Sequence, residues 1–175
     1  DCNSGGGRRS RYLMSGTGMD NQRMDDKLLA RMRFSALDSL GRREHSRREL
    51  ATKLSAKFDL PVHAPEVQAC LDQLALDGYQ SDERFAEVFV RSRRARGYGP
   101  LFIEQELRQR GITPELIVAV VDRSDEEWLL LAGDQKRKKF GVGTVTALKE
   151  KAKVVRFLRY RGFLQPQVEA ALQGY

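Results

Sequence analysis

The chain has 175 residues, with 31 lysines and arginines against 24 acidic residues and a formal net charge of +7. This length suits one ordinary domain or a short array of small units, and the positive balance favours an anionic partner over a neutral small molecule. Hydrophobic residues make up 41% of the chain, which is enough for a core, but no apolar run reaches the roughly 18 residues that indicate a membrane-spanning helix.

The scarcity of cysteine and histidine excludes most metal sites and most nucleophilic enzymes. The chain has two of each. Cys70 lies in an apolar pattern, where we expect a buried thiol, and neither His45 nor His63 has partners at a spacing typical of zinc ligands. We therefore expect no catalytic residue, no metal and no cofactor. Residues 1–23 also lack the apolar stretch of a secretory signal, so we expect a cytoplasmic protein.

Residues 1–23 are rich in glycine, serine and arginine and have no apolar period. Such a composition predicts a disordered tail. Met14, Met19 and Met24 are each a candidate for the native start, so part of this tail need not be native sequence.

From Met24 onward, apolar residues recur at intervals of three and four, which indicates helices throughout. Pro100 and Pro114 each precede a periodic segment, and proline suits the first helical position because no intrahelical N–H is needed there. Gly111 and Gly162 each follow an arginine at a predicted helix end, where a left-handed residue is common. These residues mark the boundaries of an all-α chain.

An internal repeat is the most informative pattern. Residues 107–112 (LRQRGI) match residues 158–163 (LRYRGF), and a weaker copy surrounds Leu54. The leucines at 54, 107 and 158 are spaced by about 50 residues, a period that suits three helices per unit. The prediction is three tandem helical repeats over residues 24–80, 81–123 and 124–175, which stack because each is too small to bury its own faces.

Basic residues gather near the ends of the predicted long helices. Bases in a last helical turn stabilise the helix dipole, but three clusters at corresponding positions would also form a spaced basic stripe. The last repeat is the most basic, with a net charge of +4. The candidate residues for contact with a phosphate backbone or an acidic protein groove are Arg42, Arg43, Arg91, Arg93, Arg94, Arg96, Lys136, Arg137, Lys138, Lys139, Lys149, Lys153, Arg156 and Arg159.

Two other interpretations compete with this one. Residues 97–100 (GYGP) and 141–144 (GVGT) precede helices as phosphate-binding loops do, but no predicted strand precedes them and neither has the Gly-Lys-Ser/Thr ending. Residues 46–79 are compatible with a winged helix-turn-helix whose recognition helix covers residues 67–75. A stand-alone DNA-binding protein of this winged-helix-like kind is therefore the alternative function.

The sequence resembles the RecX family in residues 78–86 (GYQSDERFA), 103–112 (IEQELRQRGI) and 157–163 (FLRYRGF). The resemblance covers roughly residues 30–173. It implies an all-α fold of three tandem three-helix repeats that form an elongated, curved array. It also implies a regulator without enzymatic activity, which binds the groove of the RecA filament on single-stranded DNA.

In that family, such binding suppresses the recombinase, ATPase and co-protease activities of RecA, and so modulates recombinational repair and the SOS response. The expected partner is therefore the RecA filament on single-stranded DNA, and direct contacts with DNA stay open. We expect no membrane partner, and we expect a monomer.

Overall fold

A computed structural model describes residues 17–174, with side chains from Met24 onward. The disordered tail was predicted for residues 1–23. Residues 1–16 lie outside the described residues, whereas residues 17–23 form the start of the first helix, which begins at Thr17 rather than near Met24. The described part is entirely helical and contains no strand, which confirms the all-α prediction. Its helices are α1 (Thr17–Leu40), α2 (Arg47–Phe58), α3 (Pro65–Leu76), α4 (Asp82–Ala95), α5 (Pro100–Gln109), α6 (Pro114–Val120), α7 (Glu127–Phe140), α8 (Leu148–Tyr160) and α9 (Gln165–Gln173).

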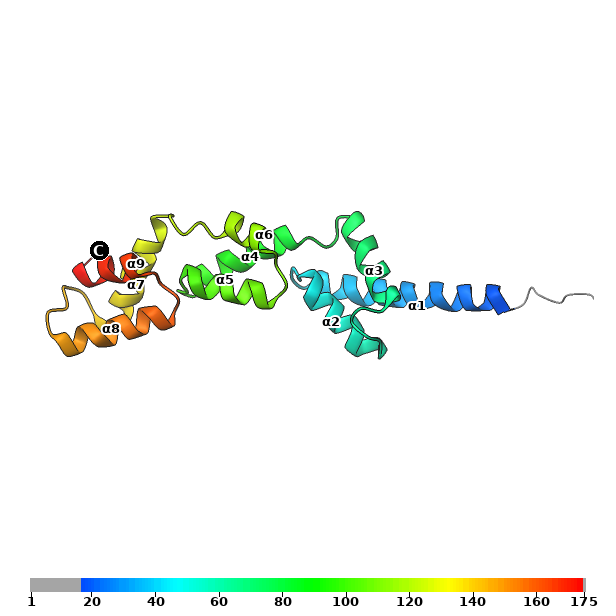
Figure 1. Ribbon diagram of the computed structural model, residues 1–175, viewed down its shortest axis with the longest axis horizontal. Helices are drawn as coiled ribbons and strands as arrows, with labels where there is room; N and C mark the ends of the chain where they lie inside the picture. Colours follow the sequence, from blue (N-terminus) through cyan, green and yellow to red (C-terminus); the bar gives the residue numbers. More distant parts are fainter. Residues whose placement is uncertain (1–16, 175) are drawn as a thin grey trace, which may run out of the picture.

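The helices form three small bundles that follow one another along one long axis (Figure 1). We call them the N-terminal bundle (α1–α3), the middle bundle (α4–α6) and the C-terminal bundle (α7–α9). Each has its own hydrophobic core, and the repeated leucines Leu54, Leu107 and Leu158 are buried in the three cores in turn. The elongated array of three-helix repeats is therefore confirmed.

Local sequence explains where the helices begin. Ser46 and Ser81 cap α2 and α4, because each side chain accepts a hydrogen bond at 3.2 Å from the backbone N–H three residues later. Helix α7 differs, because its N-cap residue, Glu126, provides no side-chain cap. The N–H of Glu127 instead donates to the carboxylate of Asp125 at 2.9 Å.

Cys70 is buried in the core of the N-terminal bundle, with 4% of its surface exposed. This confirms the expectation from the sequence. Burial raises the pKa of the Cys70 thiol, which disfavours the reactive thiolate. The residue therefore acts as a small hydrophobic group in this core.

A buried carboxylate ties α5 to the segment that follows α6. Glu104 is 3% exposed and accepts hydrogen bonds from Arg123 at 2.6 and 2.7 Å and from Arg108 at 2.9 Å. The hydrogen bonds from Arg123 outweigh desolvation and hold the pKa of Glu104 below its ordinary value. The ionised form of Glu104 is therefore stabilised by folding.

We expect Glu104→Gln to lower the free energy of unfolding by about 1.5–3 kcal/mol at pH 7, because charge-assisted hydrogen bonds are lost. Since folding depresses the pKa of Glu104, its contribution is full above the unfolded-state pKa of about 4.3. The contribution disappears as the pH falls through the lower folded-state pKa. Urea denaturation of both proteins between neutral and acid pH measures this, and a stability difference independent of pH would contradict it.

Candidate interaction surface

Helices α2, α5 and α8 follow one another end to end along one side of the array (Figure 1). At the junction of α8 and α5, the N–H of Gly99 donates to the carbonyl of Arg161 at 2.7 Å, and the N–H of Leu101 donates to the carbonyl of Gly162 at 3.0 Å. Helix α5 has no side-chain cap, so the carbonyl groups at the end of α8 satisfy its first N–H groups. We call this contact the C-terminal joint.

Two glycines make this close approach possible. Gly162 has a φ of +84°, and a Cβ atom there would lie 2.3 Å from the backbone nitrogen of Phe102. A Cβ atom at Gly99 would lie 2.6 Å from the carbonyl of Gly162. Gly162 is therefore required both for its backbone conformation and for lack of space, whereas Gly99 is required for lack of space alone.

A related contact, the N-terminal joint, links α5 to α2. The hydroxyl of Ser46 donates to the carbonyl of Arg110 at 2.8 Å. Gly111 has a φ of +80°, and a Cβ atom there would lie 2.9 Å from the side chain of Arg48. The Arg-Gly pair of the repeat thus ends a helix and also places that helix against the preceding bundle.

Arg161, the arginine of the Arg-Gly pair at the end of α8, stabilises the C-terminal joint. One nitrogen of Arg161 donates to the carbonyls of Arg96 and Gly97 at 2.9 and 3.0 Å. Its guanidinium carbon lies 5.4 Å from the ring centroid of Tyr98 and 4.9 Å from that of Phe157, within range of cation–π attraction. From the sequence, this arginine is predicted only to precede a helix end, and its recurrence before glycine in two repeats is the one sign of a further role.

Three of the predicted contact residues are buried or half-buried and engage partners inside the molecule. Arg93 forms a bidentate ion pair with Glu106 at 2.5 and 3.0 Å, and Arg94 bonds Asp125 at 2.6 Å. The hydrogen bond from Arg94 lowers the pKa of Asp125. Lys136 is 2% exposed and donates to a backbone carbonyl. These three side chains contribute to the packing within and between bundles.

The other predicted bases are exposed to solvent. On α8, Lys149, Lys153 and Arg156 are spaced by four and three residues and therefore share one helix face. Lys153 pairs with Glu150 at 2.8 Å, an exposed contact that leaves the lysine available. The remaining exposed residues of the predicted set are Arg42, Arg43, Arg91, Arg96, Arg137, Lys138, Lys139 and Arg159.

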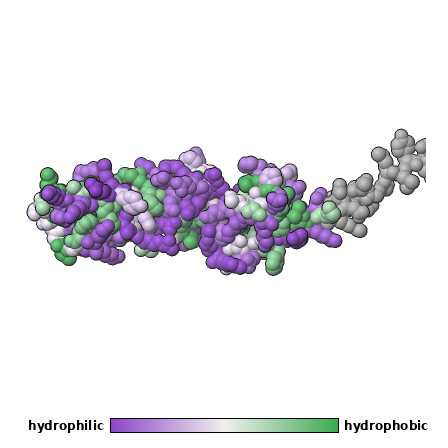
Figure 2. Space-filling model, turned by 90° about the horizontal axis from the view of Figure 1, so that it is seen from below, coloured by the Kyte–Doolittle hydropathy of each residue, from purple (hydrophilic) through white to green (hydrophobic). Residues whose placement is uncertain are grey.

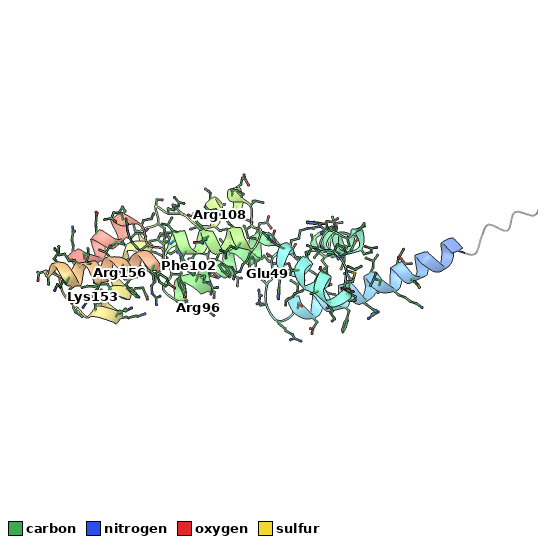
Figure 3. All side chains as sticks on the ribbon, turned by 60° about the horizontal axis from the view of Figure 1, so that its bottom comes forward. Glu49, Arg96, Phe102, Arg108, Lys153 and Arg156 are labelled. Atoms are coloured by element: carbon green, nitrogen blue, oxygen red, sulfur yellow. The ribbon has the colours of Figure 1, made fainter. Side chains whose placement is uncertain are left out.

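The exposed bases of α8 lie on a side of the array to which all three bundles contribute residues. Figure 3 shows Glu49 of α2, Phe102 of α5, and Arg156 and Lys153 of α8 along one line parallel to the long axis, with Arg96 beside it. The face seen in Figure 2 is predominantly hydrophilic, with smaller hydrophobic patches. The end-to-end helices thus present a long polar face, which we call the α2–α5–α8 face.

A basic cleft of about 300 Å³ opens at the N-terminal joint. Inside it, Lys53 lies 2.8 Å from Nε2 of the buried His45, whose Nδ1 lies 2.9 Å from the carbonyl of Arg43. Burial lowers the pKa of His45, so the neutral ring donates from Nδ1 and accepts from Lys53 at Nε2. The cleft is lined by Arg43, Arg48, Glu49, Thr52, Lys53, Gln109 and Arg110.

Three bases of this cleft, Arg48, Lys53 and Arg110, are not among the predicted contact residues, because none belongs to a basic cluster at the end of a predicted long helix. Only the approach of α5 to α2 brings Arg110 beside the other two. The sequence indicates only that Arg48 and Lys53 lie on the exposed side of α2. Many solvent-exposed residues have that property, so it does not single out a binding site.

Residues 81–121 match the family model of the RecX second three-helix domain. A Regulatory protein RecX from Halorhodospira halophila is 44% identical over 140 residues, which cover 80% of this chain and 85% of the relative. The chain belongs to the RecX family. A second Regulatory protein RecX, from Escherichia coli O9:H4, is 35% identical over 153 residues, or 83% of this chain and 92% of the relative. Both RecX relatives are thus named as regulatory proteins.

Solved structures of RecX proteins have the same fold. A crystal structure of regulatory protein RecX superposes with a TM-score of 0.75 at 20% identity, covering 91% of this chain and 80% of the other. The structure of RecX from Lactobacillus salivarius gives a TM-score of 0.68 at 17% identity, with coverages of 84% and 96%. The RecX fold therefore extends over nearly all of the described residues.

The described residues, 17–174, contain neither a grouped set of metal ligands nor a helix able to span a membrane. Within them, no three or more histidine, cysteine, aspartate and glutamate side chains are grouped so as to hold a metal ion. None of the helices in residues 17–174 is both long and apolar enough to span a bilayer.

Proposed function

We propose that this protein binds the groove of the RecA filament on single-stranded DNA and inhibits the recombinase, ATPase and co-protease activities of RecA. It would thereby modulate recombinational repair and the SOS response, as a cytoplasmic monomer that catalyses no reaction itself. The observation that carries the proposal is membership of the RecX family, at 44% identity over 80% of the chain.

The geometry supports this proposal in two ways. The array is elongated (Figure 1), so it has the reach to contact more than one subunit of a filament. Its α2–α5–α8 face carries exposed bases, and arginine pairs readily with both carboxylates and phosphates. Inhibition follows if the protein binds one state of the filament more tightly than another, since equal affinity for both states would shift nothing.

Titration of the RecA ATPase tests the proposed function. With RecA assembled on single-stranded DNA, we expect ATP hydrolysis to fall with increasing concentration of this protein and then to level off once the filament is saturated. Strand exchange should fall over the same concentration range. An ATPase rate that stays unchanged at saturating protein would contradict the proposal.

The basic cleft at the N-terminal joint favours a second candidate, a protein that binds DNA by itself. That function predicts tight binding to DNA in the absence of RecA, with an affinity that falls steeply as salt increases. Fluorescence anisotropy of a labelled oligonucleotide measures both properties. Negligible binding at moderate salt would exclude this candidate and leave the filament as the target.

A further inference from the structure

The C-terminal bundle contains a buried lysine without a counter-charge. Lys136 of α7 is 2% exposed, and its ammonium group donates to the carbonyl of Gly143. Among the residues that the structure describes, no carboxylate lies within 4 Å of this ammonium group. Buried charges in proteins are ordinarily paired, because removing an ammonium group from water is costly.

The internal repeat shows which counter-charge the C-terminal bundle lacks. Aligning Trp128 of α7 with Phe85 of α4 makes Lys136 equivalent to Arg93. In the middle bundle, Glu106 neutralises Arg93 through two hydrogen bonds. The residue equivalent to Glu106 in the C-terminal bundle is Phe157, which immediately precedes the repeated leucine. The C-terminal bundle therefore has the equivalent cation without the equivalent anion.

A cavity of about 240 Å³ lies beside Lys136, between α7, the loop that follows it and the start of α8. Helix α8 begins at Leu148, and the preceding residue, Ala147, provides no side-chain cap. At the starts of α2 and α5, the carbonyls of Arg110 and Arg161 from the following bundle fill the equivalent space. At the start of α8, no backbone hydrogen bond from another bundle is found among the described residues, so the equivalent space there is open.

The walls of the cavity indicate which anion suits it. Phe140, Val142, Val145 and Val154 are apolar, and Val142 is 92% exposed at its mouth. Glu150 also lines the cavity and is paired with a lysine of its own helix. The lining joins one buried ammonium group to apolar side chains and to the hydroxyl groups of Thr144 and Thr146. A single carboxylate with apolar neighbours matches this one positive charge better than the many charges of a polyanion such as nucleic acid.

We propose that this cavity binds an acidic protein segment, with one carboxylate at Lys136 and the flanking apolar side chains against the valines. The segment would take the place that the next bundle occupies at the two joints. This inference goes beyond inhibition of RecA, because it assigns a partner chemistry to the C-terminal bundle whichever protein supplies the segment.

An NMR titration tests the proposal without RecA, so its outcome is independent of the proposed function. The probes are acetyl-leucyl-aspartyl-leucine amide, its asparaginyl analogue and inorganic phosphate. We expect the aspartyl peptide to shift the backbone amide signals of residues 143–149 and to bind at least about tenfold more tightly than the analogue, the ratio typical of a charge-assisted hydrogen bond. Phosphate should bind more weakly than the aspartyl peptide.

Three variants make the test specific. Lys136→Met keeps the length of the side chain and should reduce affinity for the aspartyl peptide by about tenfold or more. Lys151→Met, an exposed change on α8, is the matched control and should bind like the parent. Glu150→Gln removes the repelling carboxylate and should tighten binding by about twofold. Equal binding of the two peptides by the parent, unchanged binding by Lys136→Met, or tighter binding of phosphate would overturn the proposal.

Discussion

Replacing Gly162 with alanine is expected to separate the C-terminal bundle from the middle bundle and to lower the stability of their contact by roughly 3 kcal/mol. A left-handed conformation costs a residue with a Cβ atom about 1–2 kcal/mol. The new methyl group would also lie 2.3 Å from the nitrogen of Phe102, and relieving such an overlap typically costs about 1–3 kcal/mol. Thermal unfolding should shift downward by roughly 6–12 °C.

The same substitution at Gly78 is the matched control for conformation. Gly78 has a φ of +74°, close to the value of +84° at Gly162, but a Cβ atom there meets nothing within 4 Å. Gly78→Ala should therefore cost only the conformational part, about 1–2 kcal/mol. Calorimetry of both variants measures the difference. Equal losses of stability would show that the C-terminal joint contributes nothing beyond glycine's conformational freedom.

Much of the fold was predictable from the sequence because the same buried and positive-φ positions recur from one bundle to the next. The leucines at 54, 107 and 158 repeat because each fills the centre of one bundle, and this burial imposes a period that is visible in the chain. The glycines at 111 and 162 repeat because each ends a helix with a positive φ. These are local requirements, and local requirements leave regular marks on a sequence.

The candidate surface was less predictable, because the partner of a charged side chain is set by tertiary packing. Arg93, Arg94 and Arg96 form one cluster in the sequence. In the structure, the first two meet carboxylates from α5 and from the start of α7, while Arg96 stays exposed. A charge cluster therefore gives no indication of which members are free until the facing helices are placed.

Charge reversal on α8 is expected to have the largest effect on inhibition. The variant Lys149→Glu, Lys153→Glu, Arg156→Glu changes three exposed residues on one face of the most basic bundle. With each contact to an anionic filament worth about 1 kcal/mol, the affinity should fall roughly 100-fold at low salt. The concentration that halves the RecA ATPase rate on single-stranded DNA measures this shift.

A control variant with the same change of net charge separates contact from general attraction. Lys27, Arg31 and Lys57 are exposed bases of the N-terminal bundle, at the opposite end of the array (Figure 1). If general attraction governs binding, reversal of either triple weakens inhibition equally, because both change the net charge alike. If α8 contacts the filament, only its triple has the large effect. Parent-like inhibition by the α8 triple would remove this face from the proposed contact, whereas the assignment to the RecX family would stand.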